Sequence, residues 1–185
     1  MLFNPKNRFE KIRLYAIIRW AMYIFLIFVS AVLINVGRGV NPIYFIPLCL
    51  CICMNEGEYT SAVLGGICGL IIDEACARVF FGFSSILMIA FSVGSVLIFR
   101  HMLFKNGINI VILTAVCTFI YQLLDYFFFY AMWNYEGSGQ VFSDISIPCI
   151  FYTVLISPVV YFIVKQISKR FYPKKAKTIE EAMKV

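Results

Sequence analysis

Charged residues are scarce in this sequence of 185 residues. Only 14% of them are Asp, Glu, Lys or Arg, whereas 62% are hydrophobic and the mean hydropathy is +0.86. A soluble domain averages about 25% charged and about 45–50% apolar residues. One water-facing globule cannot bury so much apolar surface, so lipid must cover much of the chain. The sequence also has no low-complexity segment, no clear internal repeat and no composition shift that would mark an attached soluble domain.

The residue groups that carry most enzymatic chemistry are missing as well. His101 is the only histidine and stands beside Arg100 in an expected loop, where a solvated role is typical. No Ser/His/Asp set and no metal-ligand cluster appears. The glycines between residues 65 and 69 do not follow a strand, which a dinucleotide-binding fingerprint requires. We therefore expect no enzymatic activity, no cofactor and no bound metal.

The seven cysteines lie almost wholly within or at the ends of apolar segments. Cys49 and Cys53 are four residues apart and could share a helix face, but no His or acid lies within that run to complete a soft-metal site. We interpret the cysteines as small polarizable hydrophobic residues. They are Cys49, Cys51, Cys53, Cys68, Cys76, Cys117 and Cys149.

Six apolar segments predict six transmembrane helices and an all-α integral membrane protein. A membrane span needs about 20 residues, and the second segment has only twelve, so we expect there a short, partly protein-covered helix or a re-entrant one. Pro158 should kink the sixth helix. The membrane domain is expected over residues 14–167, between basic ends at 1–13 and 168–185. The expected helices are Leu14–Val36, Ile43–Met54, Tyr59–Cys76, Phe83–Phe99, Ile108–Trp133 and Ile145–Ile167.

The positions of the basic residues predict the orientation. Thirteen of the sixteen Lys and Arg residues fall in segments that are cytoplasmic if the amino terminus is inside, and the outer segments hold only Arg38 and Arg78. The remaining one, Arg19, could snorkel to the inner interface, so that the first span effectively begins at Trp20. We expect both ends inside, against an anionic inner leaflet. This location of the net charge of +6 argues against nucleic acid as a partner.

Small residues and one acid recur every four positions in the third expected helix. Residues with this spacing line one face of a helix. In a bilayer, small residues let the backbone of another helix come close. We interpret this face, with a neighbouring glycine and the turn glycine that follows the helix, as a docking surface for a partner. The candidate docking residues are Ser61, Gly65, Gly66, Gly69, Asp73 and Gly82.

Two acids lie within apolar segments, toward the outer leaflet. An acid at the bilayer centre raises the free energy of insertion by roughly 2.5–3.5 kcal/mol. Some interaction or function must therefore account for the presence of Asp73 and Asp125 in these segments. For Asp73 two interpretations stay open. One is a polar site for a small molecule or a partner helix, and the other is hydrogen bonding inside the bundle with Gln122, a tyrosine hydroxyl or Arg78. For Asp125 the second interpretation is favoured.

The order of the motifs resembles one membrane-protein family. Asn41-Pro42, a short apolar run, Glu56-Gly57, then Gly65-Gly66-x-x-Gly69-Leu70-x-x-Asp73 and Gly82 are similar to the rod shape-determining protein MreD over about residues 41–97. Two departures are Gly66, where the family often has a bulky residue, and the polar stretch from Glu74 to Arg78.

The resemblance implies a non-catalytic scaffold in the bacterial cytoplasmic membrane that supports peptidoglycan synthesis and rod shape. The implied partners are an MreC-like single-span protein, a RodA-like polymerase, a class B penicillin-binding protein and, indirectly, MreB filaments. The implied fold is similar to the six-helix substrate-binding subunits of energy-coupling-factor vitamin transporters, and such a subunit is the alternative function. Those subunits commonly show an Ala-xxx-Ala pattern on their first helix, and Ala16, Ala21 and Ala31 lack that spacing.

Overall fold

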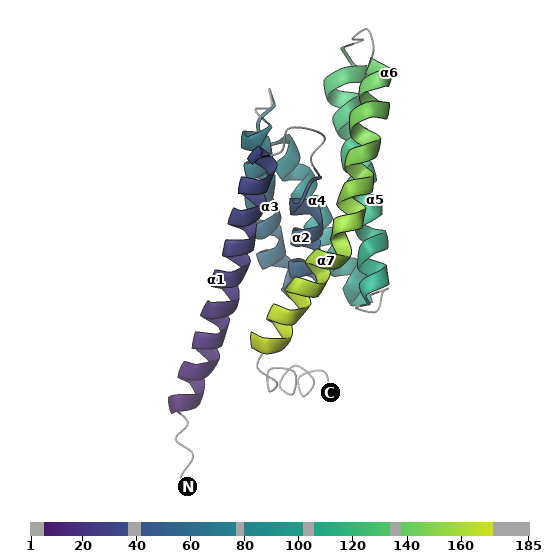
Figure 1. The fold of residues 1–185 in the computed structure, drawn as a ribbon. Coiled ribbons are helices and arrows are strands. Elements are labelled where there is room, and N and C mark those ends of the chain that lie inside the picture. The colour runs from purple at the N-terminus through teal and green to yellow at the C-terminus, as the bar shows by residue number, and fades with distance from the viewer. Residues whose placement is uncertain (1–5, 37–41, 77–79, 102–105, 134–137, 172–185) are drawn as a thin grey trace.

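The computed structural model describes residues 6–36, 42–76, 80–101, 106–133 and 138–171, and within these ranges the chain is helical with no strand. Six continuous helical rods run up and down a bundle (Figure 1). The start of α1 and the end of α7 lie at the same end of the bundle, as an even number of passes requires. The rods are α1 (Lys6–Val36), α2 (Phe45–Cys53), α3 (Glu58–Ala75), α4 (Phe83–His101), α5 (Gly107–Tyr126) with the π-helical η1 (Phe127–Ala131), and α6 (Ser138–Val141) followed without a break by the π-helical η2 (Phe142–Ser146) and α7 (Ile147–Phe171).

Within the described residues, four stretches are long and apolar enough to cross a membrane, so the chain is a multi-pass helical membrane protein. Of the two remaining rods, α2 is too short, at nine residues, and α3 carries three acids, Glu58, Asp73 and Glu74. Six complete crossings and the inside location of both ends stay predictions. The four stretches are Leu14–Asn35, Phe83–His101, Gly107–Ala131 and Gly139–Phe171.

The helix α2 forms the centre of the bundle. Every residue from Phe45 to Cys53 is buried, and α2 contacts α1, α3, α4, α5 and α7. At about 1.5 Å per residue the helix is only about 13 Å long, less than half of the hydrocarbon core of about 30 Å. A helix that is apolar all round belongs in a core. At its entrance, the backbone N–H of Ile43 donates to the Oγ1 of Thr153 on α7 at 3.0 Å. The expected short helix is therefore covered by protein.

The helix bounds differ from the expected ones mainly at polar ends. Helix α1 begins at Lys6 rather than Leu14, because Lys, Arg and Glu are good helix formers even outside the apolar stretch. The last rod begins at Ser138 and ends at Phe171, several residues beyond the expected Ile145–Ile167. Helix α7 contains Pro158 and changes direction along its course in Figure 1. Next to the proline, the Ser157 hydroxyl donates to the carbonyl of Val154 at 2.8 Å and satisfies the acceptor that the missing proline N–H leaves free.

Candidate functional site

The glycine face of α3 packs against α4 of the same chain. A Cβ built on Gly65 would come within 2.6 Å of the backbone oxygen of Met88, and one on Gly69 within 2.6 Å of the backbone nitrogen of Ser85. Both glycines are buried. The close helix approach that the spacing predicts is therefore real, but the second helix is α4. This corrects the expectation of a free docking surface at Gly65 and Gly69.

The acid at the end of the same face caps α4. Asp73 is 1% exposed, and its carboxylate accepts the backbone N–H of Gly82 at 2.8 Å and that of Ser84 at 3.1 Å. The first N–H groups of a helix have no partner within the helix, and a negative charge there is favoured by the helix dipole. Gly82 lies in the turn with φ +100°, a conformation that favours glycine. Of the two interpretations of Asp73, hydrogen bonding inside the bundle therefore fits the structure, and its partners are backbone N–H groups. The suggested partner Arg78 lies outside the described residues.

The other candidate docking residues also lie inside the bundle or face it. Ser61 is fully buried, and the carbonyl of Gly66 accepts a hydrogen bond from the Ser85 hydroxyl at 3.2 Å. A Cβ on Gly66 would lie 3.5 Å from the end of the Ile89 side chain, in ordinary contact. The residues of the motif therefore build one close helical hairpin, α3–α4.

Polar contacts continue from this hairpin toward α5 and α7. The Ser84 hydroxyl on α4 and the Tyr121 hydroxyl on α5 are 2.8 Å apart. Gln122, 7% exposed, donates from its Nε2 to the Cys149 sulfur on α7 at 3.0 Å. Asp125 is half-buried on the same helix, α5. Tyr121 and Gln122 link neighbouring helices, so polar groups inside the membrane region are used to join the bundle.

Cysteines fill the space where α2, α3 and α4 meet. Cys49 lies 3.8 Å from the sulfur of Cys53 on the next turn of α2 and 3.2 Å from the Ser92 hydroxyl on α4. Cys68 is fully buried too, whereas Cys76 is exposed. Among the described residues, no group of three His, Cys, Asp or Glu side chains is placed to hold a metal ion.

Two ion pairs mark the end of the bundle that contains the α2–α3 connection. Arg19 on α1 lies 3.0 Å from Glu56, and each side chain is only 11% exposed. Arg100 on α4 lies 2.7 Å from Glu58, at a more exposed place. Burial raises the pKa of Glu56 above the ordinary glutamate value, and the opposing effect of Arg19 is smaller. Arg19 is therefore level with the α2–α3 connection and paired there, and its location at the inner membrane interface stays a prediction.

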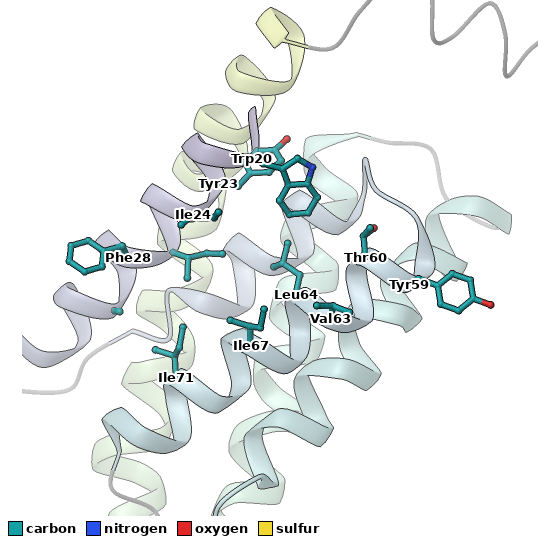
Figure 2. Close-up of a pocket in the computed structure, with 12 residues that line it drawn as sticks. Trp20, Tyr23, Ile24, Phe28, Tyr59, Thr60, Val63, Leu64, Ile67 and Ile71 are labelled. Carbon is teal, nitrogen blue, oxygen red and sulfur yellow. The ribbon is translucent and has the colours of Figure 1, made fainter. Parts of the chain in front are cut away.

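An apolar groove of about 640 Å³ opens between α1 and α3 (Figure 2). It exists because α3 presents different residues on its two sides. Glycines face α4 and allow close packing, whereas the branched Val63, Ile67 and Ile71 line the groove beside α1. No motif in the sequence predicts this groove; the only signal for it is the row of branched residues beside the glycine row. The lining is Trp20, Tyr23, Ile24, Ile27, Phe28 and Ala31 on α1, and Tyr59, Thr60, Val63, Leu64, Ile67 and Ile71 on α3.

No protein-family model, curated protein or solved structure matches this chain in comparisons of its sequence and fold.

Proposed function

We propose that the protein is a non-catalytic membrane scaffold of the MreD type, which holds an MreC-like single-span partner in the bacterial cytoplasmic membrane. The observation that carries this proposal is the role of the motif residues. Gly65, Gly69, Asp73 and Gly82 together make one tightly packed and capped hairpin, α3–α4. A motif that preserves a rigid hairpin suits a protein whose task is to present a surface. In the same proposal, the assembled partners include a RodA-like polymerase and a class B penicillin-binding protein, with MreB filaments joined indirectly.

The side of this hairpin that remains for a partner is the lipid-facing side of α4. Ile86 and Leu97 are 71% and 41% exposed, and Ala90 between them is exposed as well. Gly94 lies on the same helix, and a Cβ built on it would meet nothing within 4 Å. The backbone of α4 is thus open to the approach of a second helix at this point, which is how small residues act in membrane helix pairs.

The test uses Gly94, the glycine of α4 whose surroundings are open. Gly94→Leu should reduce recovery of the partner while the protein stays folded, because the added side chain enters open space. Gly69→Leu is unsuitable for this test, because the added side chain would meet the backbone of α4 and disrupt the hairpin itself. A suitable control is Val159→Leu on α7, a residue that is 58% exposed on another helix.

The measurement is purification of the tagged protein from its native membrane in mild detergent, followed by mass spectrometry. Enrichment of an MreC-like protein and a peptidoglycan polymerase, reduced by Gly94→Leu and unchanged by Val159→Leu, supports the proposal. Recovery of paired ATPases with a coupling subunit would instead identify a vitamin-capturing transporter subunit. Full recovery of the MreC-like protein with Gly94→Leu would still support the scaffold role, but it would contradict α4 as the docking surface.

A further inference from the structure

The length of the α1–α3 groove fits one leaflet of a bilayer. Its lining runs from Trp20 to Ala31 on α1 and from Tyr59 to Ile71 on α3. At about 1.5 Å per residue these stretches are roughly 16–18 Å long, about half of a hydrocarbon core of about 30 Å. A seat for a membrane-spanning helix would be expected to run through both leaflets. The groove instead is about as long as the acyl chains of one leaflet.

One end of the groove coincides with the polar boundary of the bundle. Trp20 and Tyr59 follow directly on Arg19 and Glu58, the residues of the two ion pairs. In Figure 2 the ring of Trp20 lies over the groove near Thr60, whereas Tyr59 points away from it. Tryptophan and tyrosine are typical of the membrane–water interface. The groove therefore begins beside the polar boundary of the bundle and runs from there along the apolar parts of α1 and α3.

The lining favours a flexible chain over a helix backbone. Membrane helices that pack closely use small residues, but Ala31 is the only small apolar residue in this lining. Thr60 is the other short side chain, and its hydroxyl already donates to the carbonyl of Gly57 at 2.8 Å. A groove between bulky aliphatic side chains is filled well by an acyl chain, which adapts its shape to them.

Charge favours an anionic headgroup at the open end. Helix α1 continues without a break from the groove back to Lys6, and this first part of the helix contains Lys6, Arg8, Lys11 and Arg13 with Glu10 as its only acid. Basic residues beside a span attract anionic lipids by about 1 kcal/mol each near the surface. We propose that the α1–α3 groove binds one anionic phospholipid, with an acyl chain between the two helices and its headgroup toward the basic start of α1. This proposal is independent of the partner protein proposed above.

Two matched valines test the site. Val63 lines the groove and is 64% exposed, and Val159 on α7 is 58% exposed outside it. Val63→Phe should fill part of the groove, and Val159→Phe should not. Both side chains point away from the core, so both variants should fold, and the larger Ile67→Trp serves as a second groove variant. Native mass spectrometry of the purified full chain, delipidated and then titrated with phosphatidylglycerol or phosphatidylcholine of equal chain length, gives the number of lipids retained.

We expect one retained phosphatidylglycerol on the wild-type chain and on Val159→Phe, and a loss of at least severalfold on Val63→Phe and Ile67→Trp. Absence of a retained lipid on the wild-type chain overturns the proposal, and so does equal retention by the valine variants. Equal retention of phosphatidylcholine overturns the preference for an anionic headgroup.

Fluorescence locates the bound chain. The protein has two tryptophans, and Trp133→Phe leaves Trp20 in the groove as the only one. In a phosphatidylcholine bilayer with a low fraction of brominated phosphatidylglycerol, Trp20 should be quenched more strongly than by the same fraction of brominated phosphatidylcholine. Val63→Phe should remove this excess quenching. Equal quenching by the two brominated lipids contradicts a specific site.

Discussion

The carboxylate of Asp73, in the last turns of α3, accepts the backbone N–H of Ser84 in the first turn of α4 at 3.1 Å. A side chain from one helix thus caps the next helix across a turn, and the second bond to Gly82 fixes that turn. The glycines one and two turns earlier allow the same two helices to lie close. Close approach and capping therefore act on a single helix pair, which makes the α3–α4 hairpin the most strongly specified part of the described fold.

Removal of the Asp73 carboxylate should destabilise the hairpin. Asp73→Ala leaves the N–H groups of Gly82 and Ser84 without their acceptor, and loss of a helix cap lowers the free energy of unfolding by about 0.5–2 kcal/mol. Asp73→Asn keeps one acceptor oxygen and should lose less. Thermal unfolding in detergent measures the difference, with the exposed Asp144→Ala as the control. Equal stability of Asp73→Ala and Asp144→Ala would contradict the capping role.

Two glycines of the hairpin should respond to alanine with opposite signs. Gly69→Ala places a methyl group against the backbone of α4, and overpacking of this kind reduces stability by about 1–3 kcal/mol. Gly94→Ala places the same group in open space, and alanine is favoured over glycine in a helix by about 0.5–1 kcal/mol. The midpoint of thermal unfolding should fall for the first variant and stay or rise for the second. A fall of equal size in both would show that α4 packs differently from the structure.

A tyrosine hydroxyl should contribute to the contact of α4 with α5. Tyr121 is fully buried and its hydroxyl lies 2.8 Å from that of Ser84. Tyr121→Phe leaves the Ser84 hydroxyl without this partner, and a net hydrogen bond contributes about 0.5–1.5 kcal/mol. Tyr59→Phe is the control, because Tyr59 is 91% exposed. Denaturant unfolding should show a loss for Tyr121→Phe alone, and an unchanged value would mean that water replaces the bond.

The sequence is informative about where helices lie and less so about what they touch. Apolar runs between polar turns locate each helical rod, because lipid and core both demand apolar side chains, but α1 and the last rod begin well before their apolar runs. The spacing of Gly65 and Gly69 correctly predicts a close helix contact, but spacing does not say whether the second helix belongs to the same chain. The partners of Asp73 are backbone groups positioned by the turn at Gly82, which no side-chain pattern reveals.

The central position of α2 in the bundle could not be predicted from the sequence either. Its composition predicts a buried helix, but burial by lipid and burial by protein select the same apolar residues. Only the assembled bundle, in which five other helices contact α2, distinguishes the two. The groove is likewise visible only in the assembled bundle, since its lining comes from two helices, α1 and α3.

The ion pair at the α2–α3 connection should make stability depend on pH. Burial raises the pKa of Glu56 in the folded protein above its value in the unfolded chain, although Arg19 lies 3.0 Å away and acts in the opposite direction. Between these two values the folded protein holds more protons than the unfolded chain, so the free energy of unfolding falls as the pH rises through that interval. Below the interval the contribution is fully present.

Glu56→Gln removes this titration and should flatten the decline of stability over that interval. Glu58→Gln is the matched control, because it removes a glutamate from the more exposed pair with Arg100 and leaves Glu56 in place. Unfolding in detergent at a series of pH values, from below the ordinary glutamate pKa to neutrality, gives the slope for each protein. If Glu56→Gln keeps the slope of the wild-type chain, the buried Glu56 is not the source of the pH dependence.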